Sequence, residues 1–597
     1  MKNRTLNSIS RNKIIAVIAG VLCALAIAAI AILPTAFSLP VRAEESETVF
    51  EEVTPFVGSD ETEMNFNWLA LPSTNESQSL YVIEQPNPED DENFDYDEAA
   101  EFEAEMSESS RVHYSGNYRR YTATATDLKP DTRYAYCISD GENYSPVYSF
   151  VTGTDGTAMN FVVFGDAQLG TNGQDKLIKE DKPSWFDALK TADEQFSPSF
   201  IMHLGDEVES YTSNAAELPM SEEQYTVFYG SDVARRYAFA NVIGNHEVAK
   251  SNWSEHHNFP NLSTGTQKGT EGVQGNDYWF VRGNVLVFVI NSNNYNTLTH
   301  DKFLTDAIEA AEEKYGDRIE WKIAAMHHAM FGANHITKEE QPPSVRQREM
   351  SETISKHGID LVFQAHEHVY CRSHMMYGLE ADHSCAERGY YVSEAEGKKT
   401  LWVTAGSSTA NKVFDADYIV NDHVAAYNDD KQSPQLINVV IRGGRLTVEA
   451  YVRGESKPFD EFTLYSVDPA DSVPVIQTKD VKIKKGAKFS PLDGVLAYDG
   501  VEGDITLDVK WEGSVDTSKA GKYTLKYTVT TKFGKTAEAT RNITVGSAAG
   551  CASEIAGEGI YNYKTWLYIG AIVLGFIILA VLFPRMSKKR GQENEIK

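Results

Sequence analysis

Two histidines separated by one residue, His366 and His368, follow a short apolar run that begins at Ile359. The run predicts a buried strand, and the break into polar residues predicts where that strand ends. At a strand end both imidazoles can point into one opening and reach an ion at about 2.0–2.1 Å. The pair alone is a weak sign of a metal site, and its weight comes from other segments that end in the same way.

Five apolar segments end in residues that can bind a metal. Their polar ends are Gly165-Asp166-Ala167-Gln168, Gly205-Asp206-Glu207, Gly244-Asn245-His246-Glu247, Met326-His327-His328 and Ala365-His366-Glu367-His368. Carboxylates, an amide and imidazoles are ligands for Zn, Fe or Mn, and they differ from the thiolates of copper-type sites. Each residue taken singly is more often a turn former or a core histidine, so the indication of metal chemistry rests on all five segments together.

The segments that carry these residues belong to a run of alternating strands and helices. Expected strands cover residues 159–166, 198–206, 238–245, 277–293 (a hairpin), 321–331, 359–368, 400–406 and 436–452. Expected helices cover residues 183–196, 222–237, 300–316 and 344–358. The alternation predicts a layered α/β fold with ligands bound at strand ends.

Short alternating strands on either side predict two further β units. The first has expected strands at residues 64–71, 79–85, 119–128, 132–140 and 147–153. The second has expected strands at residues 479–489, 504–513, 521–534 and 539–545. The acidic stretch 84–110 inside the first unit predicts a solvated, poorly ordered loop, with calcium binding near Asp95 and Asp97 as the alternative.

Three patterns resemble known families. The order D, GD, GNHE, H and AHxH of the five polar segments resembles the metallophosphoesterase (calcineurin-like phosphoesterase) superfamily. Residues 128–136 resemble a turn of fibronectin type III-like domains, and residues 60–153 look like the sandwich that precedes the catalytic domain of purple acid phosphatases. The strings YDGVEGDIT and VDTSKAGKYTLKYTV resemble Ig-like modules of bacterial surface proteins. The purple acid phosphatase-like part covers about residues 60–465.

The resemblance implies two divalent or trivalent cations, Fe, Zn or Mn. The bridging ligand would be Asp206, the first cation would also bind Asp166 and His368, and the second would bind Asn245, His327 and His366. A carboxylate must lie between the cations because they repel strongly at about 3.5–4 Å. A metal-held hydroxide would attack phosphorus, while His246 would stabilise the developing charge or protonate the leaving oxygen. Glu247 would orient a neighbouring imidazole.

The sequence departs from this family pattern at the first cation. Purple acid phosphatases have a tyrosine where this chain has Glu209, and the wider superfamily has a histidine where it has Gln168. Either Glu209 or Gln168 would then supply the fourth ligand, and no purple charge-transfer band is expected. Residues flanking the ligands are candidates for contact with the substrate phosphate: His328, His335, Tyr370 and Arg372. Arg372 offers the best geometry, although Tyr370 and Arg372 would equally brace the loop.

The two ends of the chain predict targeting and anchoring. A basic start, an apolar run over residues 14–33 and small residues near 43 predict a secretory signal, with a retained anchor as the minority reading. An apolar segment ahead of Arg585 predicts a membrane helix with a cytoplasmic tail. The layout is a signal peptide (1–43), a fibronectin type III-like domain (44–155), a metallophosphoesterase domain (156–466), an Ig-like domain (467–546), a linker (547–563), a transmembrane helix (564–583) and a tail (584–597).

Charge and cysteine content limit the possible partners. The net charge of -31 over 597 residues argues against nucleic acid, so phosphate groups must be attracted by local cations. Of the 5 cysteines, Cys371 and Cys385 could form a disulfide beside the histidine pair or remain two thiols.

The sequence therefore predicts an extracellular, membrane-anchored phosphohydrolase that acts on small phosphomonoesters. One alternative is a phosphodiesterase with the same chemistry. The other is a surface binding or adhesion protein with a degenerate phosphoesterase domain, which the flanking β-sandwiches and the missing tyrosine favour.

Overall fold

The computed structural model describes residues 49–546, apart from residues 86, 114–115, 210–217, 248–251, 264–276, 295, 334–344, 385–388, 392–397, 415, 417–421, 429–432, 467–471, 500–501 and 532–533. The expected signal peptide (1–43), linker (547–563), membrane helix (564–583) and tail (584–597) lie outside these residues. Within the described part of the chain, no helix is long and apolar enough to cross a membrane. The anchor therefore stays a prediction from the sequence.

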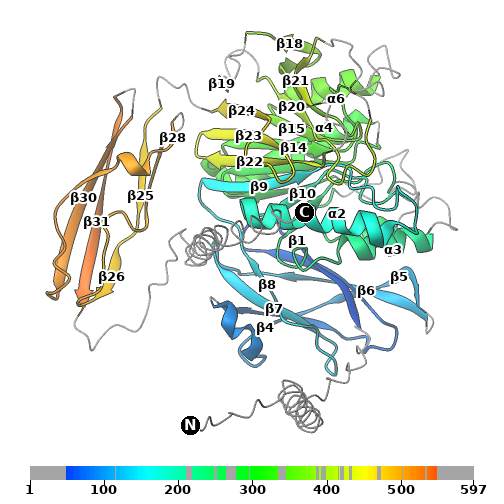
Figure 1. The fold of residues 1–597 in the computed structure, drawn as a ribbon, viewed down its shortest axis with the longest axis horizontal. Helices are drawn as coiled ribbons and strands as arrows, with labels where there is room; N and C mark the ends of the chain where they lie inside the picture. Colours follow the sequence, from blue (N-terminus) through cyan, green and yellow to red (C-terminus); the bar gives the residue numbers. More distant parts are fainter. Residues whose placement is uncertain are drawn as a thin grey trace, which may run out of the picture.

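Two large sheets form the centre of the molecule (Figure 1). The first runs in the order β19 (Gly389–Tyr391), β24 (Asp460–Tyr465), β23 (Arg445–Val452), β22 (Gln435–Arg442), β9 (Ala158–Phe164), β10 (Ile201–His203), β11 (Phe239–Asn241), β1 (Phe50–Val57), β2 (Met64–Ala70), β6 (Gly116–Ala125) and β5 (Glu105–His113). The second runs in the order β12 (Tyr278–Arg282), β13 (Val285–Ile290), β14 (Trp321–Met326), β15 (Leu361–Gln364), β20 (Leu401–Thr404), β16 (Tyr370–Ser373) and β21 (Val424–Asn428).

Parallel pairing within each sheet brings the polar strand ends to one edge. Strands β9, β10 and β11 are mutually parallel in the first sheet. Strands β13, β14, β15 and β20 are parallel in the second. Because parallel strands end at the same edge of a sheet, the loops that follow them gather there.

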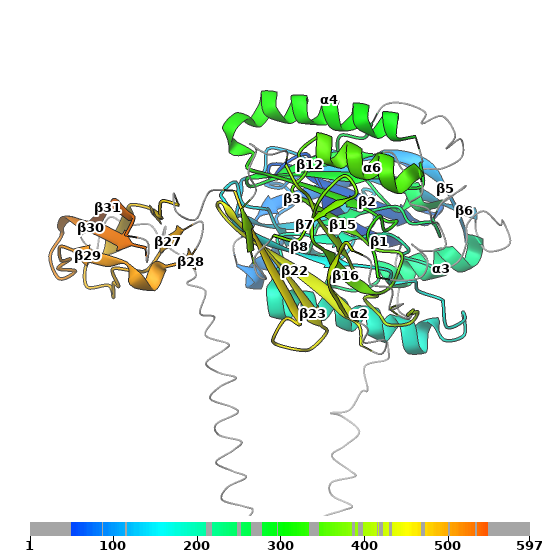
Figure 2. The same ribbon diagram turned by 90° about the horizontal axis from the view of Figure 1, so that it is seen from above.

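The sheets stack face to face, and helices cover their outer faces. Alternate residues of β13 point to opposite sides, as a strand requires: Val285, Val287 and Val289 join the core between the sheets, whereas Leu286, Phe288 and Ile290 join the core beneath the helices. Figure 2 shows α4 (Thr297–Tyr315) and α6 (Val345–Lys356) on one side, with α2 (Lys182–Thr191) and α3 (Leu218–Phe228) on the other. The expected α/β sandwich is confirmed.

The N-terminal β unit shares a sheet with this sandwich. Strand β1 pairs in parallel with β11 through Phe56 and Phe239, so the first sheet continues without a break into β2, β6 and β5. A second sheet, in the order β4 (Ala100–Glu103), β3 (Ser79–Glu84), β7 (Arg133–Ser139) and β8 (Tyr148–Val151), packs against it. Phe66 and Tyr136 meet between the two, with ring centroids 4.9 Å apart. The N-terminal β-sandwich is thus tied directly to the strands that carry the metal-binding loops.

The C-terminal unit is a small β-sandwich with its own core. One sheet has the order β26 (Val481–Lys484), β31 (Thr536–Gly546), β30 (Gly521–Thr530) and β29 (Lys510–Glu512), and the other has the order β25 (Val475–Thr478), β27 (Val495–Asp499) and β28 (Gly503–Asp504). Leu525, Tyr527 and Ile543 are fully buried in its core. This agrees with the expected Ig-like sandwich.

Two expectations about local structure are wrong. The helix expected over residues 222–237 ends at Phe228, because Ser231 starts a new turn by accepting a hydrogen bond from the Val233 N–H at 3.2 Å. The acidic stretch 84–110 is not a poorly ordered loop, since it forms a 3-10 turn (Pro88–Asn93) and strands β4 and β5. Asp95 caps a turn there by accepting from the backbone N–H groups of Asp97 and Glu98.

Candidate metal centre

The loops at the shared edge hold the polar residues in unusual backbone conformations. Five of them, Asp166, Gln168, Asp206, His366 and His368, have positive φ angles of 30°, 37°, 52°, 71° and 57°. Residues other than glycine seldom adopt this region, and such strain is concentrated at functional sites. We call Asp166, Asp206, Asn245, His327, His366 and His368 the candidate metal centre.

One group of donor atoms surrounds His327 Nε2. It lies 2.9 Å from Asn245 Oδ1, 3.2 Å from His366 Nδ1 and 3.4 Å from Asp206 Oδ1. Ligands about 2.0–2.2 Å from a tetrahedral cation are about 3.3–3.6 Å from one another. The spacing of these four donors therefore suits one cation among them.

A second group shares Asp206 and lies beside the first. His368 Nε2 is 3.5 Å from Asp166 Oδ1, and these two residues converge with Asp206 within the 4.8 Å expected of a common ion. Asp206 thus belongs to both groups. A shared carboxylate between two sets of ligands is the arrangement that a pair of cations requires.

Backbone carbonyls fix which histidine nitrogen faces the centre. The Nδ1 atoms of His327, His368 and His246 lie 2.9, 2.6 and 2.5 Å from the carbonyl oxygens of Leu204, Lys412 and Glu209. Each Nδ1–H can donate to its carbonyl, which directs Nε2 towards the centre. His246 Nε2 then faces Asp206 Oδ2 at 3.8 Å. An unprotonated Nε2 in this position can bind a metal, and a protonated Nε2 can donate a proton.

Burial keeps most of these groups neutral. It lowers the pKa of His366 to about 3 and that of His368 to about 4, so both imidazoles are unprotonated at neutral pH. Burial also raises the pKa of Asp166 to about 8, with the Asp206 carboxylate adding to the rise. For His327, burial favours the neutral form, but nearby Asp206 outweighs it and raises the pKa to about 9. A bound cation would favour the ionised carboxylates and displace a proton from His327.

Glu247 holds the loop that carries Asp206. Its carboxylate accepts from the backbone N–H groups of Asp206, Glu207 and Gly244 at 3.0, 2.8 and 2.8 Å. Gly244 is required beside it, because a Cβ there would collide with the backbone and carboxylate of Asp206. Glu247 thus positions the backbone around Asp206, and its expected role in orienting an imidazole stays a prediction.

The structure distinguishes between Gln168 and Glu209, the two candidates for the fourth ligand of the first cation. Gln168 is buried, and its side-chain Nε2 donates to Asp206 Oδ2 at 3.1 Å. Its Oε1 is buried and has no hydrogen-bond partner among the residues described. Glu209 instead lies 3.3 Å from Lys412 Nζ and is partly exposed. An unsatisfied buried oxygen beside Asp206 fits a cation, so Gln168 matches the vacant ligand position better than Glu209.

The residues expected to bind phosphate have different placements. Arg372 donates to both carboxylate oxygens of Asp460 at 2.7 and 3.1 Å, and the Tyr370 hydroxyl donates to Asp460 at 2.7 Å. Both residues therefore brace strand β24 instead of facing a substrate, which corrects the expectation for them. His328 lies beside His366, with ring centroids 4.8 Å apart. His335 and Cys385 lie outside the described residues, and Cys371 is buried.

Two basic side chains whose charges act on the centre, those of Lys412 and Arg346, were not expected from the sequence. Lys412 follows β20, and its carbonyl fixes His368. Arg346 lies in the first turn of α6, and its charge helps burial to lower the pKa values of His328 and His366. Neither residue follows a strand directly, so the strand-end pattern that marked the other residues does not include them.

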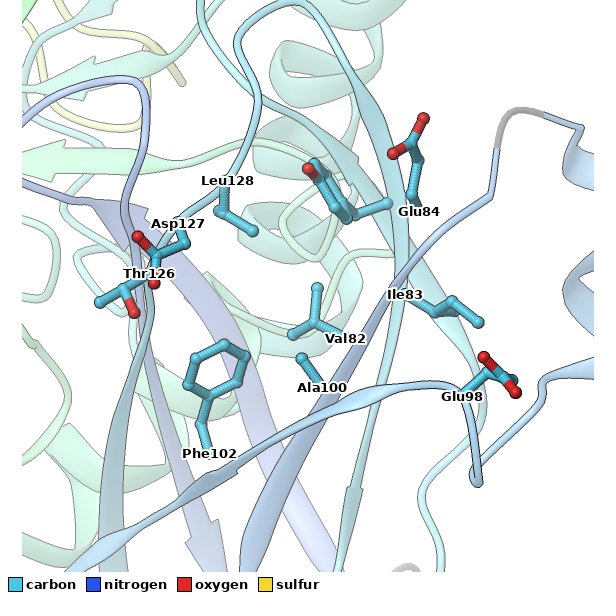
Figure 3. Close-up of a pocket in the computed structure, with 10 residues that line it drawn as sticks. Val82, Ile83, Glu84, Glu98, Ala100, Phe102, Thr126, Asp127 and Leu128 are labelled. Atoms are coloured by element: carbon cyan, nitrogen blue, oxygen red, sulfur yellow. The ribbon is translucent and has the colours of Figure 1, made fainter.

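A cavity elsewhere is unrelated to this centre. It has a volume of about 520 Å³ in the N-terminal sandwich and is lined by apolar Val82 and Phe102 beside acidic Glu84 and Asp127 (Figure 3). None of the candidate ligands lines it. Because the donor atoms lie at the strand ends and not in this hollow, chemistry is expected at the strand ends.

Three family models match successive parts of the chain. "Purple acid Phosphatase, N-terminal domain" matches residues 51–152, "Calcineurin-like phosphoesterase" matches residues 159–370 and "Bacterial surface protein, Ig-like domain" matches residues 476–545. Among curated proteins, pesticidal crystal protein Cry22Aa of Bacillus thuringiensis is 44% identical over 77 residues, which are 12% of this chain and 11% of that protein. The chain therefore spans only about a tenth of the length of that relative.

A solved structure shares the fold of most of this chain. Purple acid phosphatase PPD1 from yellow lupin (Lupinus luteus) superposes with a TM-score of 0.55 and 13% identity, over 70% of this chain and 74% of that one. PhoD superposes with a TM-score of 0.46 and 12% identity, over 69% of this chain and 88% of that one. In chain order, the protein is thus similar to the purple acid phosphatase N-terminal domain, to calcineurin-like phosphoesterases and to the Ig-like domain of bacterial surface proteins.

Proposed function

We propose that this protein is a metal-dependent phosphohydrolase that cleaves small phosphomonoesters. The observation that supports it most is the convergence of the candidate metal centre, in which imidazole, carboxylate and amide donors lie at ligand-to-ligand spacing around a shared Asp206. The neutral His368 imidazole, which points Nε2 inward, and the unsatisfied Gln168 oxygen fit bound cations.

The residues have separate roles in this proposal. Two bound cations, Fe, Zn or Mn, would supply a nucleophile at neutral pH and offset the charge that develops on phosphorus. Asp206 would lie between them, with Asp166, His368 and Gln168 on one side and Asn245, His327 and His366 on the other. His246, held by the Glu209 carbonyl, would give a proton to the leaving oxygen through Nε2. Glu247 keeps the Asp206 backbone in place.

Elemental analysis combined with a substrate panel tests this function. We expect close to two equivalents of transition metal per chain, and hydrolysis of p-nitrophenyl phosphate that a chelator abolishes. Faster turnover of bis-p-nitrophenyl phosphate would favour the phosphodiesterase alternative. Less than one equivalent of metal without chelator-sensitive hydrolysis would favour the surface binding protein.

The location and partners are further parts of the proposal. The signal (1–43) would direct export, the helix (564–583) would anchor the protein in the membrane with its catalytic domain outside the cell, and the Ig-like domain would act as a spacer. Its partner would be a small phosphoester, since a net charge of -31 repels nucleic acid. Protease treatment of intact cells should digest the catalytic domain; protection would contradict this orientation.

A further inference from the structure

Charge is distributed unevenly between the Ig-like domain and the rest of the chain. Residues 474–546 contain 12 Lys or Arg and 9 Asp or Glu, a net charge of +3, whereas the whole chain carries a net charge of -31. A basic domain on a strongly acidic chain can attract anionic partners that the other domains repel. Four of its exposed lysines, Lys482, Lys484, Lys485 and Lys522, lie together, and we call them the basic face.

The alternation of side chains along β26 and β30 turns three of these lysines away from the core. In β26, Ile483 is buried in the core of the sandwich, so Lys482 and Lys484 on either side of it point outward. In β30, Leu525 is buried in the same core, and Lys522, three residues earlier, points outward. The three ammonium groups therefore share the outer face of one sheet.

Strand pairing places these lysines in adjoining rows across the sheet of β26, β31 and β30 (Figure 1). Thr544 of β31 pairs with Lys482 on one side and with Lys522 on the other, so the three residues form one row. Adjacent strands lie about 4.8 Å apart, which separates the backbones of Lys482 and Lys522 by roughly 10 Å. In the next row, Lys484 pairs with Gly546, the last residue of β31. The three lysines are thus close neighbours at one end of the sheet.

The chain leaves the domain at this same end of the sheet. The Lys485 N–H donates to the Gly546 carbonyl at 3.0 Å, so the fourth lysine also lies beside the last residue of β31. The expected linker (547–563) begins directly after Gly546 and leads to the expected membrane helix (564–583). The basic face is therefore at the end of the sandwich that is joined to the proposed anchor.

The acidic residues next to these strands have other partners. Asp516, in the turn before β30, lies 3.2 Å from Lys519 Nζ. Asp480, ahead of β26, accepts from the backbone N–H and the side-chain Nδ2 of Asn542 at 2.8 and 3.1 Å. Among the residues that the structure describes, none forms a hydrogen bond or an ion pair with an ammonium group of the basic face. Like charges that lie together unpaired repel one another, so an anionic surface that covers them is attracted.

We propose that the basic face docks on anionic phospholipid headgroups of the membrane that carries the anchor. This inference rests on the proposed location and is independent of the phosphohydrolase chemistry. Lysines near an anionic bilayer are attracted to it, and the attraction falls off within one Debye length, about 8 Å at physiological salt. Because the basic face lies where the chain continues towards the membrane, headgroups are the anionic surface that the anchor brings close to it. Docking fixes the outer face of β26, β31 and β30 against the bilayer.

Lysine acetylation of the full chain in nanodiscs tests this docking. Nanodiscs of phosphatidylglycerol mixed with phosphatidylcholine supply an anionic surface, and nanodiscs of phosphatidylcholine alone supply a neutral one. We expect Lys482, Lys484 and Lys522 to react about fivefold more slowly on the anionic surface. Salt at about 0.5 M should remove the difference, because it shortens the Debye length to about 4 Å. Lys510 and Lys535, towards the other end of the sheet, should react equally on both surfaces. Equal reactivity of the basic face on both would overturn the proposal.

Matched triple variants separate the effect of charge from that of folding. In the parent, anionic nanodiscs should slow amide hydrogen exchange in residues 481–485, and K482Q combined with K484Q and K522Q should lose this protection. The control, K510Q combined with K526Q and K535Q, removes as many charges from the same domain and should keep it. Protection of the basic face by soluble polyphosphate, without any on anionic nanodiscs, would overturn membrane docking in favour of an anionic polymer. Both variants should hydrolyse p-nitrophenyl phosphate like the parent, so a failure of docking is distinct from a failure of the proposed function.

Discussion

Two of the buried clusters of carboxylates and imidazoles in the described residues differ in how their polar atoms are paired. One is the candidate metal centre. The other, which we call the junction cluster, consists of Glu52, Arg111, Glu222 and His256, and it joins the N-terminal sandwich to the catalytic unit. Their amino acid types are similar, so the difference in pairing indicates which cluster needs a cation.

Charges in the junction cluster satisfy one another. His256 Nδ1 lies 2.6 Å from Glu52 and its Nε2 lies 3.4 Å from Glu222, while Arg111 donates to Glu52 at 2.7 Å. Burial opposes the imidazolium, but both carboxylates outweigh it and raise the pKa of His256 to about 10. Each cation here faces a carboxylate, so the charges balance without a ligand, although Glu222 Oε2 has no hydrogen-bond partner among the described residues.

Acceptors crowd around one nitrogen, His327 Nε2, in the candidate metal centre. His366 Nδ1 and Asn245 Oδ1 lie within 3.2 Å of it, and the pKa of His327, raised to about 9, means that a proton is held where a cation would bind. The His366 and His368 imidazoles are neutral, because burial holds their pKa values at about 3 and 4. Acceptors brought together in a buried site are costly unless a cation joins them. The comparison therefore assigns binding to this cluster and stability to the junction cluster.

The largest difference between the two clusters should appear when Asp206, the carboxylate shared by both donor groups, is replaced. D206A deletes a ligand of each cation, so we expect metal content to fall below half an equivalent and turnover to fall by at least about 10³-fold, since metal catalysis contributes several kcal/mol. Elemental analysis and hydrolysis of p-nitrophenyl phosphate measure the two effects. Retained turnover would reject the role of Asp206.

The matching change in the junction cluster should affect stability and spare the metals. H256Q leaves Glu52 and Glu222 buried without their imidazolium, and breaking a buried ion pair in this way costs about 3–5 kcal/mol. We expect a lower Tm for the catalytic unit and an unchanged two equivalents of metal at low temperature. K302Q, which removes an exposed pair with Asp306, is the control and should leave Tm nearly unchanged. Loss of metal in folded H256Q would contradict the separation of the two clusters.

The junction cluster also gives stability a definite pH dependence. Because folding raises the pKa of His256 from 6.5 to about 10, its contribution is complete below about pH 6.5 and is lost as the pH rises towards 10. His256 and Arg111 outweigh burial and lower the pKa of Glu52. The stability that the Glu52 carboxylate contributes is therefore present above about pH 4.5 and is lost as the pH falls below that value. The Tm difference between the parent chain and H256Q should be largest near pH 5–6 and shrink steadily by pH 9.5. A difference that grows with pH would contradict the pairing.

Sequence reasoning could find the metal centre because its signals are local. Each candidate ligand comes directly after an apolar run, so a strand end and a donor residue appear together within a few positions. The junction cluster has no such signal: Glu52 and His256 are separated by 204 positions. Lys412 and Arg346 were missed for the same reason, since their placement follows from how whole elements pack.

Sequence reasoning failed where a residue close to the ligands in sequence looked suited to substrate binding. In the fold, a residue far away in sequence determines what that side chain contacts. Arg372 lies four residues after His368 and looked suited to phosphate, yet Asp460, 88 positions away, binds its guanidinium. Similarly, the strand β1 was not expected, although it joins the N-terminal sandwich to β11. Local patterns thus predicted the ligands, and long-range pairing decided their surroundings.

The smallest predicted effect concerns the fourth ligand of the first cation. It tests the comparison of the two clusters at a single oxygen atom. Gln168 Oε1 is a buried acceptor without a hydrogen-bond partner among the described residues, whereas Glu209 already has Lys412. Q168A should weaken binding of one of the two metals by about 10–100-fold, as loss of a supporting group does, and Q168H should bind that metal at least as well as the parent. E209Q should leave metal affinity unchanged, because its carboxylate is not among the converging donors. Competition with a chelator, followed by elemental analysis, measures both. If E209Q and not Q168A released a metal, the carboxylate would be the ligand, and the unsatisfied oxygen of Gln168 would need another explanation.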